Sequence, residues 1–172
     1  LEWEKGIDRL IDIWLSVHNT HPDWGLDIYG QGMLQDELQQ KILAANAGTY
    51  IHLKGSSPDI MYEYLNCSLL VLTSRYEGFP MALLEAMACG VPCVTYDCPF
   101  GPRSMITNMR NGILVEEGDK KEMVDKINYL IENEKNRKKI GTNARKYVLQ
   151  YSQKNIMDKW NILFNNCLTL TS

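Results

Sequence analysis

Short apolar runs alternate with longer stretches of helical spacing along most of the chain, and this alternation limits the possible folds more than any other feature. The apolar runs lie at residues 26–29, 50–54, 68–73, 91–96 and 112–115, and the helical stretches at 5–18, 33–46, 59–66 and 80–89. This order predicts a parallel sheet wrapped by helices on both sides. The run at 68–73 is nearly all apolar, which is typical of a strand covered on both faces.

From residue 119 onward the pattern is helical, with breaks near 134 and 151 and no further strand. We expect these helices to pack across the sheet or to reach elsewhere. No repeat or low-complexity linker divides the chain. The predicted fold class is therefore α/β, a Rossmann-like doubly wound parallel sheet with extra C-terminal helices, in a single domain over residues 1–172. Ligands of such sheets bind at the carboxyl ends of the strands.

Charge and cysteine content exclude several classes of protein. The 172 residues carry 18 basic and 21 acidic side chains, a net charge of −3, whereas a nucleic-acid binder normally has a basic excess. The densest basic cluster, at 135–139, is expected to be a solvated helix face. Five cysteines without a CxxC pair indicate a reduced, cytoplasmic protein. Three scattered histidines and the lack of a DxD motif predict that no metal is required.

The most informative segment reads SRYEGFPMALLEAMACGVPCV and starts at residue 74. Gly78 would let the backbone bend sharply where a ligand approaches. Pro80 suits the first turn of a helix, where its missing N–H costs nothing. The free N–H groups of Phe79, Met81 and Ala82 would then point into the cleft, and such a helix start binds phosphate oxygens.

Two carboxylates mark this segment, Glu77 just ahead of the helix and Glu85 inside it. They are separated by about 9 Å along a helix axis, too far to share one proton. They could bind hydroxyls at the two ends of one elongated ligand whose phosphates lie between them. From spacing alone, a plain strand-to-helix connection is an equal alternative.

The span from Glu77 to Glu85 resembles the E-x7-E motif of the retaining group 1 (family 4) glycosyltransferases, which have the GT-B fold. Further resemblances follow in the family's order and cover nearly the whole chain. They are Lys5-Gly6, Tyr29-Gly30-Gln31-Gly32, Leu53-Lys54-Gly55, NGILVEEGD at 111–119 and IGTNARKYVLQYS at 140–152. The resemblance implies the C-terminal, donor-binding half of a GT-B enzyme.

The resemblance also assigns roles to residues. Glu77 would be the catalytic residue at the transferring sugar, Glu85 would bind the ribose hydroxyls, and Lys5 would place a positive charge on the diphosphate. Backbone amides of Phe79, Met81 and Ala82, next to Gly78 and Pro80, would meet the diphosphate or the sugar. The strand-terminal glycines Gly30 and Gly32 and the backbone of Lys54 and Gly55 would complete the nucleotide site, the latter pair beside the base.

The implied function is transfer of a hexose, with retention, from a UDP-linked donor to a glycan or lipid-linked acceptor in cell-surface polysaccharide synthesis. The donor and a missing N-terminal acceptor domain are the implied partners, and the full-length enzyme could associate with the inner face of the membrane. A nucleotide-sugar epimerase of the same fold, or a non-catalytic nucleotide-sugar-binding module, is the alternative. We expect a fragment of an enzyme about twice as long that transfers no sugar alone.

Some residues depart from the family pattern or stand outside it. The family's diphosphate-binding Arg would fall just before Leu1, and Ser104 stands where a Glu is usual. The adjacent Arg103 is expected to be solvated or to face a phosphate. His52, within a strand, is expected to be packed. The tryptophans are expected to be core or interface anchors, with Trp3 and Trp160 covering surface that faces missing parts.

Overall fold

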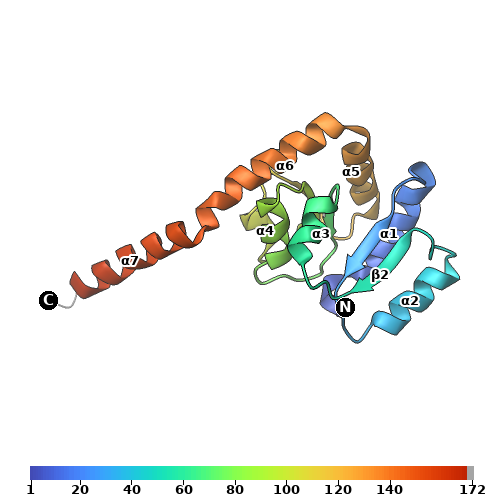
Figure 1. Ribbon diagram of the computed structural model, residues 1–172, viewed down its shortest axis with the longest axis horizontal. Coiled ribbons are helices and arrows are strands. Elements are labelled where there is room, and N and C mark those ends of the chain that lie inside the picture. Colours follow the sequence, from blue (N-terminus) through green and yellow to red (C-terminus); the bar gives the residue numbers. More distant parts are fainter. Residues whose placement is uncertain (170–172) are drawn as a thin grey trace.

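The computed structural model describes residues 1–169 and places strands and helices in the predicted order (Figure 1). The strands are β1 (Leu26–Tyr29), β2 (Ile51–Gly55), β3 (Leu70–Leu72), β4 (Cys93–Tyr96) and β5 (Ile113–Val115). The helices are α1 (Ile7–Thr20), α2 (Gln35–Ala44), α3 (Ile60–Asn66), α4 (Met81–Ala88), α5 (Lys120–Glu132), α6 (Glu134–Val148) and α7 (Gln153–Thr169), with the 3-10 turns η1 (Trp3–Lys5), η2 (Pro102–Ser104) and η3 (Leu149–Tyr151). Every predicted strand and helix is confirmed.

The strands form two parallel sheets rather than one continuous sheet. One sheet has the order β1-β2, with Leu26 beside Ile51. The other has the order β3-β4-β5, and Val94 of its central strand lies between Val71 and Ile113. The prediction of a parallel sheet is confirmed, but the ladder is interrupted between β1 and β3.

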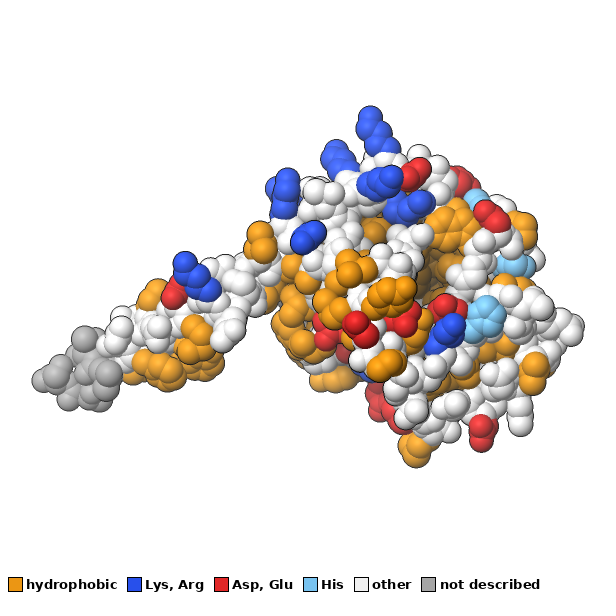
Figure 2. All heavy atoms as spheres, in the orientation of Figure 1, with side chains coloured by type: hydrophobic (Ala, Val, Ile, Leu, Met, Phe, Trp, Pro, Cys, Tyr) orange, Lys and Arg blue, Asp and Glu red, His pale blue; other side chains and the backbone are white. Residues whose placement is uncertain are grey.

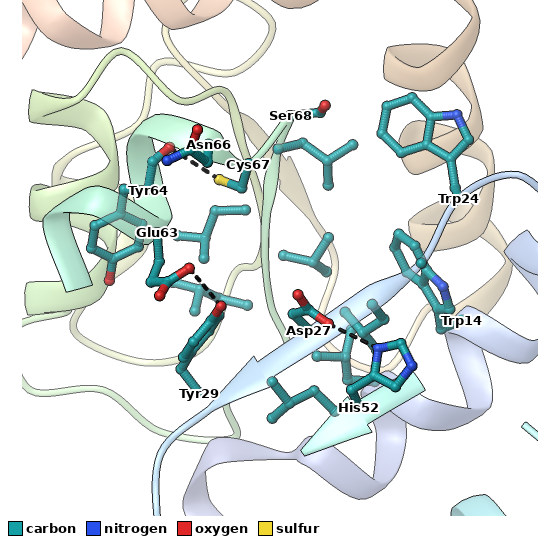
Figure 3. Close-up of a pocket in the computed structure, with 18 of the residues that line it drawn as sticks. Trp14, Trp24, Asp27, Tyr29, His52, Glu63, Tyr64, Asn66, Cys67 and Ser68 are labelled. Carbon is teal, nitrogen blue, oxygen red and sulfur yellow. Dashed lines mark hydrogen bonds and ion pairs between the residues drawn. The ribbon is translucent and has the colours of Figure 1, made fainter. Parts of the chain in front are cut away.

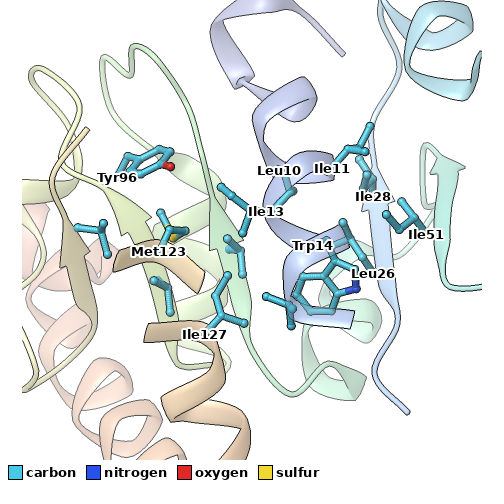
Figure 4. Close-up of a cluster of buried hydrophobic side chains, with 14 of the residues drawn as sticks. Leu10, Ile11, Ile13, Trp14, Leu26, Ile28, Ile51, Tyr96, Met123 and Ile127 are labelled. Atoms are coloured by element: carbon cyan, nitrogen blue, oxygen red, sulfur yellow. The ribbon is translucent and has the colours of Figure 1, made fainter. Parts of the chain in front are cut away.

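Helix α1 joins the two sheets through one hydrophobic cluster (Figure 4). Its buried residues Leu10, Ile13 and Trp14 lie between Ile28 of β1 on one side and Ile127 of α5 on the other. Burial of side chains of this size contributes about 1.5–3 kcal/mol each. The packing of α1, and not a shared ladder, therefore keeps the two sheets together.

A second hydrophobic cluster covers the opposite face of the three-stranded sheet. It contains Leu83 and Met87 of α4 and Ala144 of α6. In β4, Val94 belongs to the first cluster and its neighbour Cys93 to the second, as the twofold alternation of a strand requires. Strands β3 to β5 are therefore covered on both faces, as predicted.

The two-stranded sheet has one open face, where Asp27, His52 and Lys54 are exposed. The imidazole Nδ1 of His52 lies 3.0 Å from Asp27 Oδ1. The prediction that His52 is packed is wrong, because residues of β2 alternate between the α1 face and solvent. The prediction of helices on both sides holds only for the three-stranded sheet.

The C-terminal helices pack in different places. Helix α5 contacts α1, α6 contacts α4, and α7 projects away from the body (Figure 1). At the α4–α6 contact, a Cβ on Gly141 would lie 2.0 Å from the carbonyl oxygen of Gly90. The lysines of α6 are exposed, as predicted, but Arg137 is half-buried and donates to the carbonyls of Leu130 and Ile131 at 2.8 Å and 2.9 Å. Apolar side chains of α7, Trp160 and Phe164 among them, are exposed (Figure 2).

Candidate functional site

The turn that carries Lys5 is fastened to the carboxyl end of β3. The Thr73 hydroxyl donates to the carbonyl of Gly6 at 2.8 Å. Gly6 has a φ of 63°, and a Cβ there would lie 2.1 Å from the Thr73 carbonyl oxygen. Only glycine accommodates both the left-handed conformation and this backbone contact. Gly6 thus positions Lys5 beside the loop that follows β3.

Lys5 and Glu77 meet in an ion pair, although 72 positions separate them in the chain. Lys5 Nζ lies 2.9 Å and 3.1 Å from the two carboxylate oxygens of Glu77. The Ser74 hydroxyl donates to the same carboxylate at 2.7 Å, and a Cβ on Gly101 would lie 2.9 Å from the Glu77 Cβ. Glu77 is 8% exposed, whereas the Lys5 side chain is 53% exposed. The carboxylate is therefore fixed, and the cation remains open to a ligand.

Helix α4 starts directly after this carboxylate. Pro80 is its N-cap, not a residue of the first turn as predicted, and no side chain caps the helix. The first-turn amides of Met81 and Ala82 are thus left for a ligand. The chain bends at Gly78, as predicted, although Gly78 does not have a positive φ. A Cβ at Gly78 would meet nothing within 4 Å, and the Phe79 side chain beside it is exposed.

The second carboxylate, Glu85, is half-buried and is held by α3. The Tyr64 hydroxyl donates to Glu85 Oε2 at 3.3 Å. The preceding residue, Glu63, accepts from the Tyr29 hydroxyl at 2.7 Å and from the Ser57 hydroxyl at 3.2 Å. Burial, together with the nearby Glu85, raises the pKa of Tyr64, and burial with the Glu63 hydrogen bond raises the pKa of Tyr29 to about 12. Both phenols remain protonated donors at neutral pH.

The predicted glycines gather at the carboxyl ends of β1 and β2. The Gly30 N–H donates to the Gly55 carbonyl at 2.8 Å, and both residues have a positive φ. A Cβ on Gly32 would lie 1.9 Å from the backbone nitrogen of Leu1. The Lys54 side chain lies apart from this group and faces Asp27 at 3.9 Å, so only its backbone can serve the predicted role.

The loop after β4 forms the remaining wall. A hollow of about 610 Å³ is lined by residues 97–101, Arg103, Ser104 and Glu117. Arg103 Nε lies 3.0 Å and 2.9 Å from the carboxylate oxygens of Asp97. The Arg103 side chain is exposed, as the solvated alternative predicts, and it is paired with Asp97 of its own loop. Phe100, at a φ of 71°, is exposed and meets the Tyr76 ring edge-on at 6.2 Å.

Sequence reasoning missed the side chains that hold the site residues, namely Ser74, Glu63, Tyr64 and the hydroxyl of Tyr29. The position of Ser74 directly after an apolar strand was the only available signal. The assembled groups comprise one exposed ammonium, a set of open helix amides and a carboxylate on either side of them. Such a set suits an elongated ligand with an anionic centre and hydroxyl groups at its ends.

The sequence profile described as glycosyl transferases group 1 matches residues 1–147. The chain belongs to this family. It is 32% identical over 163 residues to a poly(ribitol-phosphate) alpha-N-acetylglucosaminyltransferase of Staphylococcus aureus, covering 94% of this chain and 33% of that protein. It is also 32% identical over 165 residues to the amylovoran biosynthesis glycosyltransferase AmsD of Erwinia amylovora, covering 96% of this chain and 46% of that protein.

A solved structure of a glycosyltransferase agrees with this assignment. The pneumococcal O-GlcNAc transferase GtfA, in complex with UDP and GlcNAc, superposes with a TM-score of 0.87 at 27% identity, over 97% of this chain and 34% of that one. The fold is therefore that of the C-terminal domain of a GT-B glycosyltransferase. The chain spans less than half the length of the curated relatives it matches.

Within residues 1–169, no group of three or more His, Cys, Asp or Glu side chains is arranged to hold a metal ion. In the same residues, no helix is long and apolar enough to cross a bilayer.

Proposed function

We propose that residues 1–172 form the nucleotide-sugar-binding domain of a longer, two-domain retaining hexosyltransferase that uses a UDP-linked donor without a metal ion. The observation that carries this proposal is the fixed Glu77 carboxylate beside the exposed Lys5 ammonium, at the open start of α4. The UDP and GlcNAc named for the pneumococcal relative support the choice of donor.

Each group then has a defined task. Lys5 and the amides of Met81 and Ala82 would neutralise the diphosphate as it leaves the sugar, which stabilises developing negative charge. Glu85 would accept hydrogen bonds from the ribose hydroxyls. Glu77, held by Ser74, would contact the transferring sugar and stabilise positive charge at its anomeric carbon.

The bond between the anomeric carbon and the diphosphate oxygen breaks in this reaction, and a bond to an acceptor hydroxyl forms on the same face of the sugar. The acceptor proton passes to the leaving diphosphate. We assign the acceptor site to the N-terminal part of the longer enzyme, so this chain alone is expected to transfer no sugar. A cytoplasmic place at the inner face of the membrane, in cell-surface polysaccharide synthesis, would fit the relatives' names.

Calorimetric titration of the chain with UDP, GDP and their hexose conjugates tests the proposal. We expect UDP and UDP-hexoses to bind with similar affinity, and GDP to bind more weakly. Absence of binding for every nucleotide would contradict the proposal, as would sugar transfer by this chain without its N-terminal partner.

A further inference from the structure

The hollow after β4 differs in its lining from a larger hollow between the two sheets. The larger one, of about 730 Å³, is lined mainly by apolar side chains such as Trp14 and Val71 and continues the hydrophobic cluster around α1 (Figure 3). The hollow after β4, of about 610 Å³, contains the carboxylates of Asp97 and Glu117 beside the exposed ring of Phe100. Carboxylates next to exposed aromatic surface are typical of a ligand site and not of a core.

The order of the strands places this hollow on the far side of Glu77 from the nucleotide. The glycines assigned to the nucleotide lie at the carboxyl ends of β1 and β2, and Glu77 follows β3. Strand β1 faces β3 across the larger hollow, and β4 and β5 come next in the ladder. The hollow after β4 is lined by residues that directly follow β4 and shortly follow β5. Gly101 links it to the carboxylate, because a Cβ there would lie 2.9 Å from the Glu77 Cβ.

Phe100 extends into solvent from a strained position in the loop. Its φ of 71° lies in the left-handed region, which a bulky residue rarely adopts. The side chain is 81% exposed, so burial does not offset this strain. Its ring meets that of Tyr76, which directly precedes Glu77 and is 52% exposed. Backbone strain and exposed aromatic surface that do not serve packing are features of ligand-binding loops.

The charges around the hollow favour a neutral ligand over an anion. The Asp97 carboxylate is paired with Arg103 Nε at 2.9 Å and 3.0 Å, and the Glu117 carboxylate with Arg9 at 3.3 Å. These charges balance in pairs, whereas Lys5 offers an exposed cation to a diphosphate. A carboxylate has about four acceptor sites, so Asp97 and Glu117 can also accept hydrogen bonds from hydroxyl groups.

We propose that the hollow after β4 binds one neutral sugar ring of the acceptor. The C–H groups on one face of the ring would pack on Phe100 and Tyr76, and hydroxyls at its edge would donate to Asp97 and Glu117. The inference rests on the proposed function, because it takes Glu77 to mark the transferring sugar. The acceptor hydroxyl has to reach that sugar, and the β1 side is already assigned to the nucleotide. The N-terminal part of the longer enzyme would supply the rest of the acceptor site.

Titration of this chain with maltotriose and with diacetylchitobiose, followed by the aromatic NMR signals of Phe100 and Tyr76, tests the inference. We expect both signals to shift with a dissociation constant in the millimolar range, because few contacts hold one ring. Phe100→Ala should weaken this binding, now followed at Tyr76, by at least about fivefold through the loss of one aromatic contact. Tyr62→Ala is the matched control, because it removes a 61% exposed aromatic side chain that does not line the hollow.

Parallel titrations with UDP and UDP-hexose separate this inference from the proposed function. If UDP binds but neither saccharide shifts the Phe100 and Tyr76 signals, the inference is overturned and the proposed function stands. Signals that shift with UDP-hexose but not with UDP would assign the hollow to the donor's own sugar and would also overturn it. Saccharide binding without any nucleotide binding would overturn the acceptor role together with the proposed function.

Phe100→Gly tests whether the ring serves a ligand or the fold. Glycine adopts a φ of 71° without strain, so the melting temperature should stay equal to that of the parent chain or rise. Saccharide binding followed at Tyr76 should weaken as much as in Phe100→Ala. A lower melting temperature for Phe100→Gly would show that the ring stabilises the fold, against its assignment to a ligand.

Discussion

The two ends of the Glu77–Glu85 segment are built in opposite ways. Glu77 is buried and receives hydrogen bonds from Lys5 and Ser74, both at 3.1 Å or less. Glu85 is half-buried, and it accepts a hydrogen bond from the Tyr64 hydroxyl at 3.3 Å. Charge-assisted hydrogen bonds are roughly twice as strong as neutral ones. The comparison indicates that Glu77 has its geometry before any ligand arrives, whereas Glu85 retains acceptor capacity for a ligand to use.

Replacing Glu77 should have the largest effect. In the longer enzyme, Glu77→Ala is expected to lower kcat by roughly 10²–10³-fold, the range for loss of one preorganised electrostatic group, while UDP affinity changes little. Turnover and UDP titration are measured together, with Glu77→Gln as the isosteric control. Equal losses in kcat and in UDP affinity would reduce Glu77 to an ordinary binding contact.

Gly6→Ala tests the backbone contact that places Lys5 beside Glu77. The added Cβ meets the Thr73 carbonyl oxygen at 2.1 Å and the residue sits at positive φ, so we expect a loss of about 2–3 kcal/mol in the free energy of unfolding. Gly118→Ala is the matched control, because it has a positive φ but nothing within 4 Å of an added Cβ. If both variants lose the same stability by urea denaturation, the contact with Thr73 is unimportant.

Glu85→Ala tests the proposed role of the second carboxylate in binding the ribose hydroxyls. Loss of a charged acceptor for ribose hydroxyls should weaken UDP binding by roughly 1.5–3 kcal/mol, with little change in thermal stability. Tyr64→Phe removes only the hydroxyl that donates to Glu85. UDP affinity should stay within about threefold of that of the parent chain, because a single long hydrogen bond from a neutral donor contributes little. Unchanged affinity in Glu85→Ala, measured by calorimetry, would remove the ribose role.

The smallest expected effect concerns the pair Asp8–Arg75, which braces η1 from outside. Arg75 donates to both Asp8 oxygens at 2.8 Å and 2.7 Å and to the Trp3 carbonyl at 2.7 Å. The hydrogen bonds from Arg75 lower the pKa of Asp8 in the folded state. The pair therefore stabilises the fold at pH values above the unfolded pKa of about 3.9, and this contribution is lost as the pH falls through the lower folded value.

Asp8→Asn should accordingly cost roughly 0.2–1 kcal/mol at pH 7, as for other partly exposed pairs. The difference from the parent chain should shrink as the pH falls below the unfolded pKa of about 3.9 and disappear once Asp8 is protonated in the folded state. Thermal melts across this range provide the measurement. A difference that persists unchanged at low pH would show that the asparagine acts through packing and not through lost charge.

The sequence predicted the elements of this fold well because their signals are local. Apolar runs such as 91–96, which directly follows Gly90, predict strands whichever elements pack against them. The E-x7-E segment likewise has a local signature. The gap between β1 and β3 has no local signature, because it depends on which strands pair with each other in the folded chain.

Contacts across the fold were also hidden from sequence. Motifs identified Lys5 and Glu77 separately as candidate site residues. Their ion pair, however, depends on the contact between Gly6 and Thr73, which the sequence does not show. Tyr64 and Glu63 are consecutive residues of a short helix that serve two different elements, α4 and β1. Their spacing in the sequence does not indicate these partners, because the partners depend on the position of α3 against the sheet.

The contact between Gly141 and Gly90 has a consequence for mutational tolerance. Gly141 lies on α6, far along the chain from Glu77 and Glu85. Even one methyl group at this position would clash with the carbonyl oxygen of Gly90. In a saturation screen for activity, this position should therefore be as intolerant of substitution as Glu77. A ranking of sites by tolerance alone would place a packing residue among the catalytic ones.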